Sequence, residues 1–170
     1  FYNAMSGLII LFDFDRTLIP GDSDDWVVTQ MGLSSSFHRL YSTMPWSSLM
    51  DSMMAELHRR GESSDDIAQC LIRLPSHPRI IAAIQSAHAL GCDLRVVSDA
   101  NLFFIETILR SFGILSCFSK IYSNPAIVDN TGKLRIFPYH NRNDLPHGCS
   151  FCPTHMCKVR TGYHSWKKHC

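Results

Sequence analysis

The sequence predicts an α/β fold, in which a parallel, Rossmann-like sheet is interrupted after its first strand by a small helical insertion. Two short apolar runs, at 8–12 and 94–97, have the length of buried parallel strands, and each leads directly into polar residues. Between and after these runs, apolar residues recur at helical spacing. Strands that alternate with helices are typical of βαβ units, so the sheet is expected to be parallel.

The composition restricts the possible partners and locations. The chain has 170 residues, of which 45% are hydrophobic and 18% charged, enough to bury a core. Sixteen basic residues against fifteen acidic ones provide no basic face, so we expect no nucleic-acid partner. The longest apolar run, 8–12, is too short to span a bilayer, so we expect no membrane partner. Seven cysteines without a secretory signal indicate a reducing compartment and a cytoplasmic location.

The first strand, at 8–12, is followed by a helical region over 22–75 that we interpret as a cap. Asp22 and its neighbours can cap a helix that runs to residue 31. A longer helix begins near Pro45, carries methionines at helical spacing and closes at Gly61. A further helix follows Ser63, and Pro78 is expected to end this block.

The alternation resumes after the insertion. Glycines terminate two helices, at Gly91 and Gly113, because glycine readily adopts the left-handed conformation of a helix end. The predicted elements are a helix over 80–90, a strand over 94–97, a helix over 101–112, a strand over 120–123, and extended pieces at 126–128 and 133–137. The domains are therefore a core of 8–21 and 76–158, a cap of 22–75, and an atypical tail of 159–170 that shows no periodicity.

Polar residues at the carboxyl ends of the strands are where the chemistry of such a sheet is expected. Asp13 and Asp15 follow the first strand directly, and their side chains should point the same way because side chains alternate along an extended chain. Two carboxylates this close favour a cation between them, and Mg²⁺ is the natural choice because it prefers oxygen ligands. One carboxylate could attack phosphorus and the other could transfer a proton. The alternative is an acidic cluster that serves only to stabilise a helix N-terminus.

These residues carry a resemblance to a known superfamily. The string FDFDRT after an apolar strand resembles the first motif of the haloacid dehalogenase-like phosphatases, and VVSDAN at 96–101 resembles their second. With these, the segments SDDW, MPW, AHALGC, SNP, PYH and the cysteine-rich stretch at 147–158 resemble the plant branch of the phosphoethanolamine/phosphocholine phosphatase family. The resemblance covers residues 8–158.

The resemblance implies a role for each matching residue. It implies that Asp13 is the nucleophile and a Mg²⁺ ligand, and that Asp15 is the general acid/base, with its backbone carbonyl also bound to the Mg²⁺. Two further catalytic roles are implied: Ser98 would hydrogen-bond the phosphoryl oxygens, and Lys158 would neutralise phosphate charge. The implied substrate-binding residues are Thr17, which would shape the loop, and Asp24 and Asp99, which would contact a cationic amine. For Asp24 and Asp99 the alternative is helix capping, and both roles can coexist.

The implied activity is Mg²⁺-dependent hydrolysis of a small phosphomonoester through an aspartyl-phosphate, with phosphoethanolamine or phosphocholine as the partner substrate. Pyrophosphate or thiamine monophosphate is the alternative within the same branch. The family also has an acidic GDGxxD-type loop on a later strand, and nothing after Lys158 resembles it. We therefore expect a core that is incomplete at its C-terminal side, and a catalytically inactive, truncated isoform is a further alternative. The oligomeric state is not predicted.

The stretch at 147–158 poses a separate question. Cys149, Cys152 and Cys157 have spacing compatible with a zinc site, for which His140, His147 or His155 could supply a fourth ligand. The alternative is a thiol-rich turn that packs beneath the segment carrying Lys158.

Overall fold

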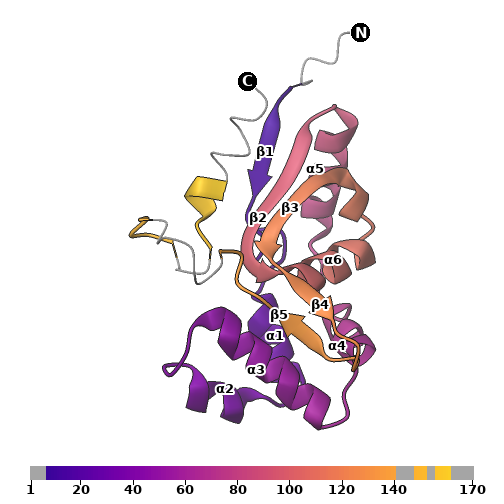
Figure 1. Cartoon of the computed structure of the whole chain (residues 1–170). Coiled ribbons are helices and arrows are strands. Elements are labelled where there is room, and N and C mark those ends of the chain that lie inside the picture. Colours follow the sequence, from indigo (N-terminus) through magenta and orange to yellow (C-terminus); the bar gives the residue numbers. More distant parts are fainter. Residues whose placement is uncertain (1–6, 141–147, 153–155, 162–170) are drawn as a thin grey trace.

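A three-stranded parallel sheet forms one part of the molecule (Figure 1). The computed structural model describes residues 7–140, 148–152 and 156–161. Strands β1 (Ile9–Phe12), β2 (Asp93–Asn101) and β3 (Phe118–Asn124) lie in the order β1-β2-β3, with Phe12 beside Val96. The predicted parallel α/β arrangement is thus confirmed, and the carboxyl ends of all three strands face the helical insertion.

Four helices form the insertion: α1 (Ser23–Gln30), α2 (Ser34–Leu40), α3 (Trp46–Arg59) and α4 (Ser64–Leu71). Asp22 caps α1 by accepting hydrogen bonds from two backbone amides, and Ser63 forms a capping box with Asp66 at α4. The methionines of α3 are buried, as their helical spacing indicated. They belong to one hydrophobic cluster that continues into the sheet region, so the insertion packs directly on the core.

The remaining helices cover the sheet. Figure 1 shows α5 (Pro78–Ala89) and α6 (Leu102–Ser111) on the same side of the strands, followed by the short helix η1 (Leu115–Cys117). Asn101 caps α6 through a side-chain bond of 3.0 Å to the amide of Phe104, whose ring is completely buried. The α6 N-terminus is therefore fixed immediately after β2, next to the sheet edge that carries the predicted site.

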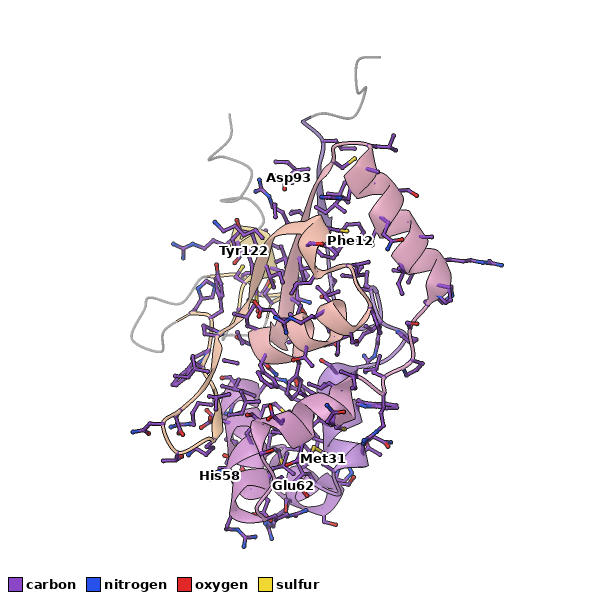
Figure 2. The ribbon with its side chains drawn as sticks, turned by 90° about the vertical axis from the view of Figure 1, so that its right-hand side faces the viewer. Phe12, Met31, His58, Glu62, Asp93 and Tyr122 are labelled. Atoms are coloured by element: carbon purple, nitrogen blue, oxygen red, sulfur yellow. The ribbon has the colours of Figure 1, made fainter. Side chains whose placement is uncertain are left out.

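A small hairpin connects the sheet to the insertion. Strands β4 (Ala126–Val128) and β5 (Leu134–Ile136) pair in antiparallel fashion, and β5 packs against α3. Asp51 of α3 accepts hydrogen bonds from the Arg135 guanidinium (3.0 and 3.2 Å) and from the Ile136 amide (2.9 Å). Figure 2, turned by 90°, shows Met31 in the helical insertion and Tyr122 in the sheet region.

Several boundaries differ from the sequence-based expectations. Strand β2 continues through Ser98 to Asn101, past a register shift, because the backbone pairs again with Asn124 of β3. Helix α2 was not predicted, since it lacks a side-chain cap and buries only Phe37. Pro78 begins α5 instead of ending the preceding block, because the first helical turn needs no amide hydrogen there.

The predicted domain boundaries are not tested by these observations and remain predictions. Of the predicted tail, residues 159–161 form one helical turn together with Lys158, and the Thr161 amide donates to the Cys157 carbonyl at 3.0 Å. A single helical turn is formed by local hydrogen bonds, and it is too short to produce an apolar periodicity that could be recognised in the sequence. Residues 162–170 lie outside the described residues. Within the described ranges, each helix is too short or too polar to cross a bilayer.

Candidate active site

The turn after β1 presents Asp13 and Asp15 on either side of a buried phenylalanine. The Phe14 side chain is completely buried, and its carbonyl accepts hydrogen bonds from the amides of Thr17, Leu18 and Ile19. Arg16 takes a positive φ of 57°, and its amide donates to the Gly21 carbonyl. A non-glycine residue in this region is strained, and such strain concentrates at functional sites. The turn thus directs both carboxylates into one cavity.

That cavity has a volume of about 250 Å³ and lies between the sheet edge and the insertion. Side chains of five segments meet in this cavity: the β1 turn, α1, α3, β2 and the turn at 158–161. Two of the residues that meet there, Asp13 and Lys158, lie 145 positions apart in the sequence. The lining residues are Asp13, Asp15, Arg16, Asp22, Asp24, Trp46, Asp99, Ala100 and Lys158.

Lys158 joins two of these carboxylates. Its Nζ lies 2.8 Å from Asp13 Oδ2 and 2.7 Å from Asp99 Oδ1. Burial acts to lower the pKa of Lys158, but the hydrogen bonds that its ammonium group donates to Asp13 and Asp99 outweigh this effect, so the pKa lies above its ordinary value. The lysine is therefore positively charged at neutral pH. The other Asp13 oxygen, Oδ1, accepts the Phe14 amide at 2.8 Å, which fixes the carboxylate in place.

Asp15 is suited to proton transfer. Burial, followed by the negative charge of Asp22, raises its pKa to about 7, although the Ser23 amide donates to Asp15 Oδ1 at 2.8 Å and opposes the increase. A general acid/base works best when its pKa lies near the working pH. Asp13 and Asp15 thus have different partners in one cavity: Asp13 accepts from the Lys158 ammonium group, and Asp15 accepts from the Ser23 amide.

Asp24 is the most deeply buried acid of the cavity. Its pKa lies well above the ordinary value because of burial and then the charge of Asp15. Trp46 Nε1 donates to Asp24 Oδ2 at 2.7 Å, whereas Oδ1 has no hydrogen-bond partner within the described part of the chain. The capping role considered for Asp24 belongs instead to Asp22, whose carboxylate accepts the amides of Asp24 and Asp25.

Ser98 and Thr17 do not line the cavity. Ser98 is completely buried in β2, where its hydroxyl accepts the Ala100 amide at 3.1 Å. Thr17 lies on the exposed side of the β1 turn. The structure therefore brings together Asp13, Asp15, Asp24, Asp99 and Lys158 among the predicted residues. The roles of all seven residues remain predictions.

Sequence reasoning missed three contributions to the site. The charge of Asp22 raises the pKa of Asp15, and the Arg16 guanidinium forms an ion pair with Asp22, with 3.5 Å between Nη2 and Oδ2. The third contribution is the hydrogen bond that the Trp46 indole donates to the buried Asp24. The sequence offered a signal for Arg16 and Asp22, since both adjoin the acidic motif. No local signal linked Trp46 to Asp24, because the two residues lie 22 positions apart on different helices.

The donor set of the cavity fits a hard cation such as Mg²⁺. Five aspartates line the cavity with only Arg16 and Lys158 as basic partners, so negative charge is in excess. Carboxylate and carbonyl oxygens are the ligands that Mg²⁺ prefers, and Asp13 together with the Asp15 carbonyl could provide two of them.

Comparisons with known proteins identify a family and several relatives. A family model described as "Putative Phosphatase" matches residues 8–167. The chain is 56% identical over 154 residues to a thiamine phosphate phosphatase-like protein of Arabidopsis thaliana, covering 91% of this chain and 63% of that protein. It is 54% identical over 153 residues to inorganic pyrophosphatase 2 of Arabidopsis thaliana, covering 90% and 55%. The chain thus spans between about half and two-thirds of the length of these curated relatives.

Solved structures share the fold. A HAD family hydrolase from Salmonella enterica serovar Typhi superposes with a TM-score of 0.57 at 16% identity, covering 76% of this chain and 44% of that one. A structure described as a phospho-aspartyl intermediate analogue of phosphoserine phosphatase superposes with a TM-score of 0.53 at 18% identity, covering 76% of this chain and 61% of that one. The family model covers nearly the whole described chain, so the chain belongs to the putative phosphatase family, and it shares its fold with a HAD family hydrolase.

Proposed function

We propose that this chain hydrolyses a small phosphate ester or anhydride through a phosphorylated Asp13. The observation that carries the proposal is the pairing of Asp13 with Lys158 at 2.8 Å in the cavity where Asp15 has a pKa of about 7. A carboxylate fixed beside a cation is a suitable nucleophile, and a neighbouring acid that titrates near neutral pH is a suitable proton donor.

The reaction has two steps. A carboxylate oxygen of Asp13 attacks phosphorus, the bond to the leaving oxygen breaks, and Asp15 gives its proton to that oxygen. A water molecule then attacks the phosphorus of the aspartyl-phosphate, Asp15 takes the water's proton, and phosphate leaves with the Asp13 carboxylate restored. Lys158 offsets negative charge on the transferring phosphoryl group. Mg²⁺, held by Asp13 and the Asp15 carbonyl, would supply further electrostatic stabilisation and orient the phosphate.

We propose pyrophosphate as the preferred substrate, with thiamine monophosphate as the second candidate. The names of the plant relatives favour this alternative over phosphoethanolamine and phosphocholine. Two features of the cavity support it. Asp99 already pairs with Lys158, and burial raises the pKa of Asp24, so neither carboxylate is a ready counter-charge for an ammonium group. Magnesium would offset the high negative charge of pyrophosphate in this acidic cavity.

The test is phosphate release from these four compounds, measured with and without Mg²⁺. We expect Mg²⁺-dependent release that is fastest with pyrophosphate and is lost by at least about a thousand-fold in Asp13→Asn. Asp65→Asn, an exposed position on α4, is the matched control and should keep the wild-type rate. Preference for phosphocholine would overturn the substrate assignment. Absence of release from all four compounds by protein with native circular dichroism would identify a non-catalytic form.

A further inference from the structure

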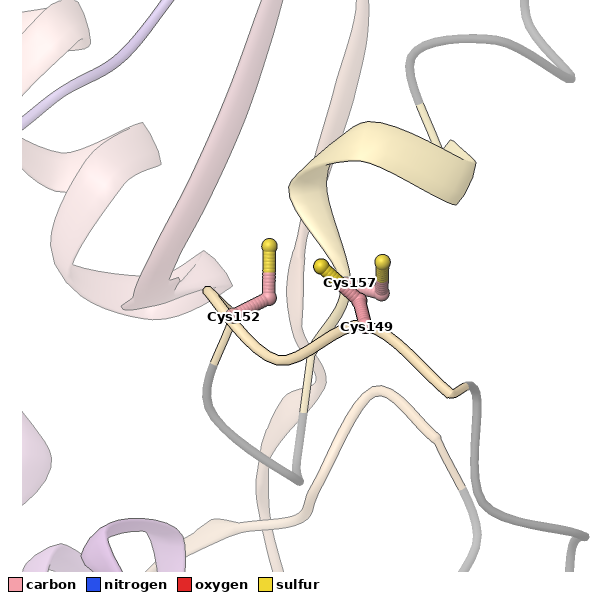
Figure 3. Close-up of side chains that lie close together, drawn as sticks. All are labelled: Cys149, Cys152 and Cys157. Carbon is pink, nitrogen blue, oxygen red and sulfur yellow. The ribbon is translucent and has the colours of Figure 1, made fainter.

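The three cysteines near the end of the described chain form a cluster that the proposed phosphatase chemistry does not use. Figure 3 shows Cys149 and Cys152 from the segment 148–152 beside Cys157, which precedes the helical turn at 158–161. Their sulfur atoms all lie within 4.8 Å of one another, and the three cysteines are not joined by a disulfide. In the described part of the chain this is the one group of cysteine, histidine or acidic residues with such spacing.

This spacing suits a thiolate-bound metal. Zinc binds cysteine sulfur at about 2.3 Å in tetrahedral geometry, which places neighbouring sulfurs about 3.8 Å apart. Three sulfurs already within 4.8 Å can reach that arrangement with side-chain adjustments alone. A disulfide would join two of the sulfurs and leave the third as an unpaired thiol. A set of three thiols is therefore better matched to a metal than to a redox pair.

Backbone amides surround the sulfurs as they do in thiolate metal sites. The Arg160 amide donates to Cys157 Sγ at 3.3 Å. The amides of Phe151 and Cys152 donate to the sulfur of Cys149. Hydrogen bonds of this kind orient thiolates and spread their charge, which metal sites need when several negative ligands converge. The loop at 148–152 is thus folded around the Cys149 sulfur before any metal is added.

We propose that Cys149, Cys152 and Cys157 bind one Zn²⁺ ion through their thiolates. The fourth coordination position is open to a water molecule or a further side chain. Among the predicted fourth ligands, His140 is not part of the sulfur cluster, and His147 and His155 lie outside the described residues. Thiolate ligands favour zinc over magnesium, so this site is chemically distinct from the carboxylate cavity.

The position of the cluster indicates a structural role. Cys157 is buried, and the next residue, Lys158, contacts Asp13 and Asp99. A metal that joins Cys157 to the loop at 148–152 would fasten the turn on which Lys158 is carried. Zinc sites of this kind contribute folding free energy directly, because the unfolded chain lacks a preformed site.

The experiment measures metal on the whole chain purified under reducing conditions without chelator. We expect about one zinc per chain by mass spectrometry, and thiolate-to-cobalt charge-transfer absorption after replacement by Co²⁺. Cys152→Ser and Cys149→Ser should lose this absorption, and Cys117→Ser, a buried thiol outside the cluster, should retain it. Asp13→Asn should also retain it, which separates this site from the carboxylate cavity.

Two outcomes would overturn the proposal. One is wild-type protein that carries no zinc and gives no thiolate-cobalt absorption when fully reduced. The other is equal zinc and equal absorption in Cys149→Ser, Cys152→Ser and the wild type. Because the first outcome is read on the wild-type chain, it does not depend on whether the variants fold. Neither measurement uses phosphatase activity, so the result is independent of the proposed function.

Discussion

Replacing Asp15 by asparagine should stabilise the metal-free protein at alkaline pH while abolishing the proposed activity. Burial and Asp22 raise the pKa of Asp15 from 3.8 to about 7, so the folded protein binds this proton more tightly than the unfolded chain does. The stabilising effect of the proton is present in full below the unfolded pKa. It is lost as the pH rises through the folded pKa.

The magnitude follows from the two pKa values. The interval from 3.8 to about 7 corresponds to roughly 4 kcal/mol, at about 1.4 kcal/mol for each pKa unit. Asparagine is neutral, has nearly the same shape and can still accept the Ser23 amide, so it resembles the protonated acid. We therefore expect Asp15→Asn to increase the free energy of unfolding by up to about 4 kcal/mol above about pH 8, with little change near about pH 4.

Urea unfolding with a metal chelator, at both pH values, measures this difference. Titrating groups distant from Asp15 behave alike in both proteins and cancel, whereas loss of the Asp15 charge also lowers the pKa of Asp24. Asp65→Asn, an exposed aspartate on α4, serves as the control and should change the free energy of unfolding only slightly at both pH values. An equal effect of Asp15→Asn at the two pH values, or destabilisation at the alkaline one, would show that Asp15 is not held with a raised pKa in the folded protein. Added Mg²⁺ should reduce the stability gap, because a bound cation offsets the charge of Asp15.

Three further outcomes test other contacts. Trp46→Phe removes the indole donor to Asp24, so the free energy of unfolding should fall by about 1–3 kcal/mol, and by more at alkaline than at acidic pH, as urea titration would show. Asp51→Ala removes the acceptor for Arg135 and for the Ile136 amide of the hairpin, so the free energy of unfolding should fall by about 1–3 kcal/mol and the melting temperature should fall with it. Wild-type stability of this variant would show that the contact does not hold the hairpin to α3. Phe104→Ala leaves a cavity under α6, so the free energy of unfolding, measured by denaturant titration, should fall by about 3–5 kcal/mol. A loss below about 1 kcal/mol would mean that neighbouring side chains move in to fill the cavity.

The helix ends show how much local sequence can predict. Asp22, Ser63 and Asn101 cap their helices through their own side chains, and Gly113 adopts a φ of 70° at the end of α6. These interactions join residues within a few positions, so they can be recognised in the printed sequence. The extension of β2 to Asn101 could not be recognised in this way, because it depends on pairing with Asn124 of another strand.

The site divides in the same way. The position of Asp13 and Asp15 after a short apolar run is visible in the sequence, and alternation along an extended chain is a local property that predicts a shared direction for their side chains. Three features depend on the folded chain: Lys158 contacts Asp13 from 145 positions away, Trp46 donates a hydrogen bond to Asp24, and burial raises the pKa of Asp15 to about 7. The physical reason is that charge pairing and desolvation depend on which surfaces pack together, and packing is a property of the whole fold.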